Sequence, residues 1–341
     1  MSSRSLRRPA GLAAALAVAA GLVVGLVQSG PAGAVGGQAA PAAPAAPAAP
    51  ASKAGLGLPL LGGLQDLVGV IDPLVRAQLP LDPRIYGSYS TRPTPSRCSS
   101  GSFSCIDKTV ADMTTRFDRL APSCNHNAVF SLLYLRVTER YKEVAATPGF
   151  FLDPRRVNYE DAVFSDLYTG AYDDWHANRP ATVPPIWRLA FAAADARQVM
   201  GSGDALLGMA AHILRDLPFT LYHIGMEDHR DHLAVNTMLA SVYDAAIAEL
   251  ARRFDSTMSA GTIVPGTDKV FMEFVVQWRE QGWRNAQDLM AAPDAAARQQ
   301  VADRIEREAW TTGLTLYLGT RYPVQQLTII RDAYCATHWN S

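Results

Sequence analysis

Residues 127–144 read NAVFSLLYLRVTERYKEV, and the apolar side chains in this stretch recur every three or four positions. These apolar positions are Val129, Leu132, Leu133, Val137, Tyr141 and Val144. That spacing places them on one face of a helix, because an α-helix has 3.6 residues per turn. The stretch therefore predicts an amphipathic helix that buries one face against other elements.

Similar apolar spacing continues through most of the sequence that follows. Helical patterns cover residues 159–175, 186–200, 204–216, 229–254, 268–290, 293–318 and 325–337. Pro218 is expected to end the helix that begins near residue 204, because proline lacks the amide hydrogen that a helix interior needs. Few stretches alternate with period two, so we predict an all-α fold in a single domain of roughly eight or nine helices over residues 106–341.

The N-terminus has the pattern of a secretory signal. Three arginines within the first eight residues precede an apolar run at 10–27, and small residues follow at 32–34. We expect a signal peptide over residues 1–34, and general secretion rather than twin-arginine export. The run is Ala- and Gly-rich and short for a membrane span, so a retained anchor is the lesser alternative. The protein is predicted to be secreted or associated with the cell envelope, with no integral membrane span after removal of the signal.

Two further segments separate this signal from the helical domain. Residues 35–55 repeat Ala-Ala-Pro units, which carry no large apolar side chains and predict an extended, disordered spacer. Residues 56–105 begin with an apolar stretch at 56–81 that Gly and Pro interrupt, followed by a loop rich in Ser, Thr, Pro and Cys. The apolar stretch either docks on the domain or serves as an interaction segment.

The four cysteines are an even number, as expected for disulfides in an oxidising compartment. They are Cys98, Cys105, Cys124 and Cys335, and three pairings are possible. If Cys98 and Cys105 close a local loop, Cys124 is left to pair with Cys335. The formal net charge of −1 does not indicate a nucleic-acid partner or an anionic membrane surface, since both favour a basic excess.

One candidate site lies in residues 206–223, LLGMAAHILRDLPFTLYH. His212 and Asp216 are four residues apart and share one helical face, within an otherwise apolar and therefore buried segment. Imidazole and carboxylate are ligands for zinc or another divalent transition metal, and His223 and Asp231 follow closely enough to complete the coordination. A structural hydrogen bond between His212 and Asp216 explains the same pair without a metal.

Acidic residues near residue 160 offer a second contribution to this site. Asp161 lies at the edge of the apolar face of its predicted helix, and it is a candidate metal ligand or general base. Asp231 is a candidate for the same two roles. Acids near a helix N-terminus also interact favourably with the helix dipole, which is the alternative explanation for Glu160 and Asp161.

Several stretches resemble a bacterial family that is common in actinobacteria, the domain of unknown function 5995. They are FSLLYLRVT at 130–138, DAVFSDLY at 161–168, PPIWRLAF at 184–191, GMAAHILRDLP at 208–218 and RDHLAVN at 230–236. The resemblance implies that the polar pattern positions form one site, and it assigns no reaction. These positions are Asp161, His212, Asp216, Asp231 and Asn236. Ser131 and Ala210 stand where the family more often has Asn.

A remoter likeness is to the metal-binding helix of the zinc-dependent phospholipase C and S1/P1 nuclease fold. His212, Asp216, Pro218 and His223 are similar to its pattern, but the second His-x-x-x-Asp/Glu pair is missing. We therefore expect a metal-dependent hydrolase acting on a phosphoester or lipid-like substrate. The alternative is a non-catalytic protein that binds a hydrophobic small molecule, or a structural protein of the cell envelope.

Overall fold

The computed structural model describes residues 98–226, 228–258 and 267–341. The expected signal peptide, the spacer and the apolar stretch 56–81 lie outside these residues. Within the described ranges the elements are helical, and the one β-type pairing is an isolated bridge between Val199 and Arg321.

The helices run in chain order along the described residues. They are α3 (Phe103–Leu120), α4 (Asn127–Ala145), α5 (Pro154–His176), α6 (Pro185–Asp195), α7 (Gly201–Ala210), α8 (Leu217–Ile224), α9 (His229–Arg253), α10 (Thr267–Ala291), α11 (Ala295–Thr320) and α12 (Thr328–His338). Six residues of π-helix, Ala211–Asp216, join α7 to α8 without a break. Counted with α7 and α8 as one continuous helix, the ten α-helices of the described residues make nine helices. The prediction of an all-α domain with eight or nine helices is confirmed.

Aspartate side chains fix the start of three helices. Asp153 accepts hydrogen bonds from the amides of Arg155 and Arg156 at 3.1 and 3.2 Å at the start of α5. Asp228 caps α9 and Asp294 caps α11 in the same way. A helix leaves its first four amides without partners inside the helix, and an aspartate before the first turn satisfies some of them.

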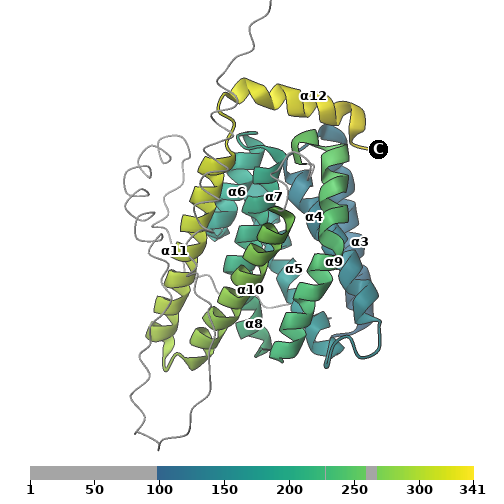
Figure 1. The fold of residues 1–341 in the computed structure, drawn as a ribbon. Helices are drawn as coiled ribbons and strands as arrows, with labels where there is room; N and C mark the ends of the chain where they lie inside the picture. Colours follow the sequence, from purple (N-terminus) through teal and green to yellow (C-terminus); the bar gives the residue numbers. More distant parts are fainter. Residues whose placement is uncertain (1–97, 227, 259–266) are drawn as a thin grey trace, which may run out of the picture. The chain divides into compact units, whose positions relative to one another are not determined.

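Helix α4 lies in the interior and packs against α3, α7 and α9 (Figure 1). Val129 and Leu132 are completely buried, as the amphipathic pattern predicts, and Ala128, which lies outside that pattern, is completely buried too. The long helices lie side by side, while α12 crosses the ends of several of them (Figure 1). The interior of the described domain is therefore formed by helix-to-helix contacts alone.

Helix α9 is the one described helix that is long and apolar enough, by length and composition, to cross a membrane. Helices of soluble domains pass the same test. An ion pair between Arg136 Nε of α4 and Glu249 Oε2 of α9, 2.6 Å apart, joins α9 to the neighbouring helix.

Two disulfides connect segments of the described chain. Cys98 pairs with Cys105, and Cys124 pairs with Cys335. This is the pairing that follows from local closure of the first loop. The second bond spans 211 residues and fastens α12 to the connection between α3 and α4. Both bonds are consistent with an oxidising environment.

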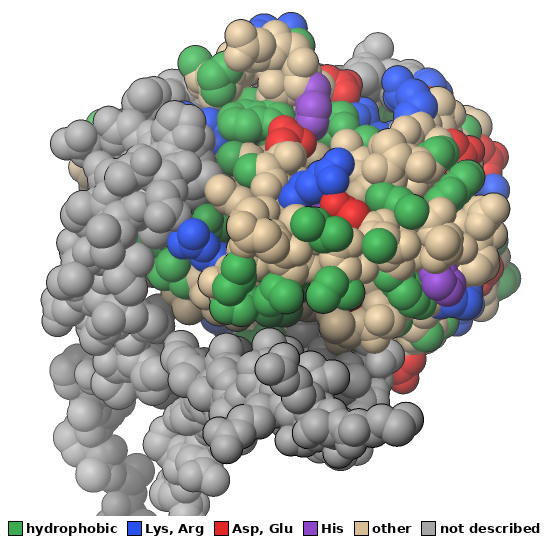
Figure 2. All heavy atoms as spheres, turned by 90° about the horizontal axis from the view of Figure 1, so that it is seen from above, with side chains coloured by type: hydrophobic (Ala, Val, Ile, Leu, Met, Phe, Trp, Pro, Cys, Tyr) green, Lys and Arg blue, Asp and Glu red, His purple; other side chains and the backbone are tan. Residues whose placement is uncertain are grey.

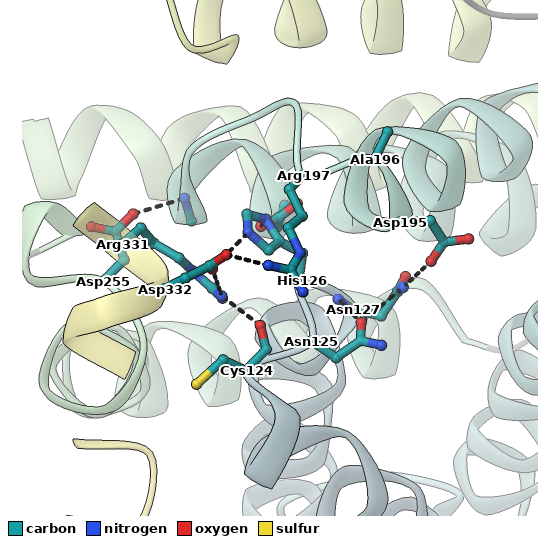
Figure 3. Close-up of polar contacts among 12 residues, drawn as sticks. Cys124, Asn125, His126, Asn127, Asp195, Ala196, Arg197, Asp255, Arg331 and Asp332 are labelled. Carbon is teal, nitrogen blue, oxygen red and sulfur yellow. Dashed lines mark hydrogen bonds and ion pairs between the residues drawn. The ribbon is translucent and has the colours of Figure 1, made fainter. Parts of the chain in front are cut away.

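Polar groups also hold α12 in place. Its buried residues are Arg331 and Cys335. Arg331 donates a hydrogen bond to the Cys124 carbonyl at 2.6 Å, and Asp332 lies 3.4 Å from Nε2 of the buried His126 (Figure 3). The outer surface of α12 exposes Ile329 and Ile330. Figure 2 looks onto this end of the molecule, where hydrophobic side chains lie among charged ones.

The prediction that Pro218 ends a helix is wrong. The rod continues through Pro218 to Ile224, where Gly225 adopts a left-handed conformation with φ of 78°. Pro218 lies in the first turn of α8, directly after the π-helical turn. A π-helical turn is wider than an α-helical turn, so the proline ring does not meet the carbonyl that it would strike in a regular helix.

Candidate functional site

The π-helical turn Ala211–Asp216 positions the candidate site, and all six of its residues are buried. In this wider turn His212 and Asp216 lie one above the other, with His212 Nδ1 3.3 Å from Asp216 Oδ2. Turns of π-helix are rare and occur frequently at functional sites. The pairing of His212 with Asp216, predicted from their spacing, is present.

Asp216 is surrounded by hydrogen-bond donors. Trp187 Nε1 donates to Oδ2 at 2.8 Å, and Arg215 donates to Oδ1 at 3.0 Å. A carboxylate accepts hydrogen bonds, so the contact with His212 requires the proton on Nδ1 and leaves a lone pair on Nε2. Burial lowers the pKa of His212, against the opposing effect of Asp216, so the imidazole is neutral at pH 7.

Arg215 extends this network to a distant helix. Its Nε donates to Glu306 Oε1 of α11 at 2.9 Å, and its guanidinium lies 4.7 Å above the ring of Phe219. Burial raises the pKa of Glu306, although Arg215 acts in the opposite direction. Buried charges are costly unless they are paired. Asp216, Arg215 and Glu306 therefore form one buried network in which removal of any member would leave another charge without its partner.

Aromatic rings enclose the His212 imidazole. The ring of Phe164 stacks on it with centroids 3.4 Å apart and planes at 11°, and the ring of Tyr134 lies 4.4 Å away. Three more rings complete the enclosure, those of Phe130, Tyr168 and Trp187. Phe164 is half-buried, whereas the other four rings are buried.

Three polar atoms in this region are shielded from solvent and have no hydrogen-bond partner. They are His212 Nε2, the Tyr134 hydroxyl and Asp161 Oδ2. Buried polar groups are normally paired, so each such group calls for an explanation. Burial, together with the charges of Glu160 and Asp166, raises the pKa of Asp161 to about 8. Burial also raises the pKa of Tyr134, with Asp161 the largest of the charges that add to the effect. At neutral pH all three groups are therefore uncharged.

The other predicted site residues make different contacts. Asp231 accepts hydrogen bonds from the amides of Leu152 and Asp153 at 2.7 and 2.9 Å, which holds the loop before α5. His223 Nε2 lies 3.2 Å from the Tyr159 hydroxyl.

Asn236 belongs to a separate contact between α9 and α10. Its side-chain oxygen accepts from Arg279 Nε at 2.7 Å, and Arg279 also donates to the His232 carbonyl at 3.0 Å. The structure thus brings together His212, Asp216 and the region of Asp161, while Asp231, His223 and Asn236 serve other contacts.

The cluster contains two side chains of the metal-ligand type in contact with each other, His212 and Asp216. The described part of the chain contains no group of three or more His, Cys, Asp or Glu residues that could hold a metal ion. Both oxygens of Asp216 already accept hydrogen bonds from protein donors. The residues present fit an imidazole that is oriented by a carboxylate better than they fit a coordination shell.

Sequence reasoning missed Tyr134, Phe164, Arg215 and Glu306 as members of the site. The role of Arg215 could have been inferred from the sequence, because an arginine directly before Asp216 in an apolar segment needs a buried partner. Glu306 is 91 residues away and gave no local signal. Trp187 is buried and also donates to Asp216.

Comparisons with known proteins give one match. No curated protein and no solved structure is similar at the significance applied. The likeness to zinc-dependent phospholipase C therefore has no support from these comparisons. A family model described as a family of unknown function (DUF5995) matches residues 106–318, from α3 through most of α11. The chain belongs to this family, DUF5995.

Proposed function

We propose that the chain is an exported hydrolase in which His212 is the general base and Asp161 is the general acid. The observation that carries the proposal is the set of three unpartnered, solvent-shielded atoms: His212 Nε2, the Tyr134 hydroxyl and Asp161 Oδ2. A substrate and a water molecule bound beside Phe164 would supply their missing partners.

The protonation states suit a proton-transfer reaction at neutral pH. The lowered pKa of His212 keeps its Nε2 able to accept a proton, and the raised pKa of Asp161, about 8, keeps that carboxyl able to donate one. Two groups whose environments move their pKa values in opposite useful directions are typical of an acid and a base in catalysis. Asp216 would hold the imidazole and stabilise its positive charge during the reaction.

The proposed step is the hydrolysis of an ester. Water attacks the carbonyl carbon while His212 Nε2 takes a proton from that water, and the Tyr134 hydroxyl donates a hydrogen bond to the developing oxyanion. The carbon–oxygen bond to the leaving group then breaks as Asp161 gives its proton to the departing alkoxide. The proton on His212 returns to the Asp161 carboxylate through solvent, which restores both groups.

The walls of the site favour an uncharged substrate with an apolar part. Five aromatic rings surround His212, and the nearest guanidinium, that of Arg215, is already bound by Asp216 and Glu306. Buried carboxylates at Asp216 and Glu306 disfavour an anionic phosphodiester. We therefore favour a lipid-like carboxylic ester over a phosphoester.

Export is part of the proposal. The signal pattern at residues 1–34 supports it, and the two disulfides are what an oxidising compartment would permit. A metal ion remains compatible with the sequence-based prediction, and the experiment below measures it directly.

The test compares four forms of the purified chain: wild type, His212→Gln, Asp161→Asn and His126→Gln. His126 is the matched control, since it too is a buried histidine paired with a carboxylate, with Nδ1 2.7 Å from Asp204 Oδ2 (Figure 3). The substrates are p-nitrophenyl butyrate and bis(p-nitrophenyl) phosphate, and bound metals are measured by mass spectrometry. Unfolding curves of all four forms separate loss of activity from loss of folding.

We expect wild type to hydrolyse the butyrate ester. His212→Gln and Asp161→Asn should lower kcat by about 10² or more, as the loss of a general acid or base does. The His126→Gln form, where folded, should retain activity. Equal rates in wild type and His212→Gln would refute the proposal. A wild type that hydrolyses neither ester but binds a fluorescent fatty acid would support the non-catalytic alternative.

A further inference from the structure

A polar groove lies between α3 and α5. Its volume is about 280 Å³, which is room for roughly nine water molecules at about 30 Å³ each. The lining residues are Thr109, Asp112, Met113, Thr115, Arg116 and Arg119 of α3, and Ser165, Asp166, Thr169 and Asp173 of α5. The groove is thus large enough for a molecule the size of an amino acid or a monosaccharide.

Most charges in the groove are already paired within the protein. Asp112 accepts from Lys108 Nζ at 2.9 Å with both oxygens, and Asp173 Oδ1 lies 3.0 Å from Arg116 NH1. The arginines are therefore the candidates for hydrogen bonds to a ligand in the groove.

Arg116 is buried and held firmly, yet one of its donors has no partner. Its guanidinium lies 4.5 Å from the ring centroid of Tyr172 and 5.9 Å from that of Tyr168. Its Nε is shielded from bulk solvent and makes no hydrogen bond. Arg119, one turn further along α3, contacts only its own helix through Nε, at 3.3 Å from the Thr115 carbonyl. Both arginines line the groove, and Arg116 Nε has no acceptor.

We propose that the groove between α3 and α5 binds a small polar ligand through a carboxylate, with Arg116 and Arg119 as the hydrogen-bond donors. A carboxylate is planar and matches the fork of a guanidinium. Asp166 and Thr169 on the opposite wall would contact a hydroxyl or ammonium group of the same ligand.

The charge balance of the groove disfavours a ligand that carries two negative charges. The lining holds Arg116 and Arg119 against Asp112, Asp166 and Asp173, a formal charge of +2 − 3 = −1. A phosphate dianion would meet three carboxylates, whereas a monoanion with a hydroxyl or ammonium group meets complementary partners. The groove lining does not include His212, Tyr134 or Asp161. The groove is thus a second site, and its existence does not depend on the proposed hydrolase.

The test is isothermal titration of the full chain with glycolate, glycine and galacturonate, and separately with inorganic phosphate. Variants are Arg116→Lys, which keeps the charge but removes the Nε hydrogen, Arg119→Gln, and Arg140→Gln as a control. Arg140 of α4 pairs with Glu143, and neither residue lines the groove, so Arg140→Gln makes the same charge change as Arg119→Gln without removing a groove donor.

We expect at least one carboxylate probe to bind with a Kd of about 1 mM or tighter. Arg116→Lys and Arg119→Gln should each weaken binding by about tenfold, as the loss of a charge-assisted hydrogen bond does. Arg140→Gln should leave the Kd within about twofold, because Arg140 is a screened surface charge outside the groove lining. Absence of binding by all three carboxylates, preferential binding of phosphate, or equal loss in Arg140→Gln and Arg119→Gln would each overturn the proposal. If Arg116→Lys does not fold, Arg119→Gln carries the test.

Discussion

Replacement of Asp161 by Asn should change how the stability of the protein depends on pH. In the folded protein the Asp161 carboxyl has its pKa raised from 3.8 to about 8. The folded state therefore holds this proton where the unfolded chain has lost it. The contribution of Asp161 to stability is fully present below about pH 4 and is lost as pH rises through about 8.

The size of the effect follows from the shift in pKa. A change from 3.8 to about 8 corresponds to on the order of 5 kcal/mol, at about 1.4 kcal/mol per pKa unit. Entry of water and local relaxation reduce such penalties in real proteins. We expect Asp161→Asn to gain about 2 kcal/mol or more relative to wild type between pH 5 and pH 9.

Urea unfolding of both forms at pH 5, 7 and 9 measures this difference. All other titrating groups are shared, so their contributions cancel in the comparison. Asp195→Asn is a control of the opposite kind. Burial raises the pKa of Asp195, but its hydrogen bonds to His176 and Trp175 outweigh burial and lower it. Asp195 in turn raises the pKa of His176 against the effect of burial, so Asp195→Asn should destabilise the fold most near pH 5 and less as pH rises and His176 loses its proton. Parallel stability curves for wild type and Asp161→Asn would refute the assignment of a protonated Asp161.

Three further changes test the surroundings of the site. Arg215→Met should destabilise the fold by about 3–5 kcal/mol in urea unfolding, because it leaves Asp216 and Glu306 buried without their cation. Adding Glu306→Gln to this variant should recover part of the lost stability. A double variant no more stable than Arg215→Met would contradict the coupling of these charges. Gly208→Ala should lower the free energy of unfolding by about 1–3 kcal/mol, because the new methyl group would lie 2.3 Å from Phe130 Cγ beside His212. An unchanged Tm would contradict this close contact. Cys335→Ser opens a 211-residue loop and should lower the free energy of unfolding by about 5 kcal/mol in the chain-entropy model. A loss under about 1 kcal/mol would mean that the polar contacts of α12 hold this helix in place without the disulfide.

The helices could be predicted from the sequence because their apolar residues repeat with the helical period. The residues of α4 and α9 show this repeat clearly, and both helices match the expected ranges to within one residue. The pairing of Cys124 with Cys335 was one of three possibilities until the path of the chain brought the two together. The continuation through Pro218 was not predictable, because the π-helical turn that permits it has no simple sequence signal.

The site was predictable only where its members are local in sequence. His212 and Asp216 share one turn, and their pairing follows from a spacing of four. The roles of Tyr134 and Glu306 depend on which helices meet at the π-helical turn, which spacing cannot show. Asp231 fits the polar family pattern, yet both of its oxygens bind backbone amides of a loop. A polar pattern therefore identifies buried polar residues without separating catalytic from structural ones.

The pH dependence of kcat/KM for p-nitrophenyl butyrate tests the proposed acid and base most directly. With the carboxyl of Asp161 at a pKa of about 8, the wild-type kcat/KM should be constant near pH 7 and fall above about pH 8, as the acid loses its proton. In Asp161→Asn the rate should be lower and this decline should disappear. A decline near pH 8 that persists in Asp161→Asn, or a wild-type profile with no decline there, would contradict the proposed mechanism.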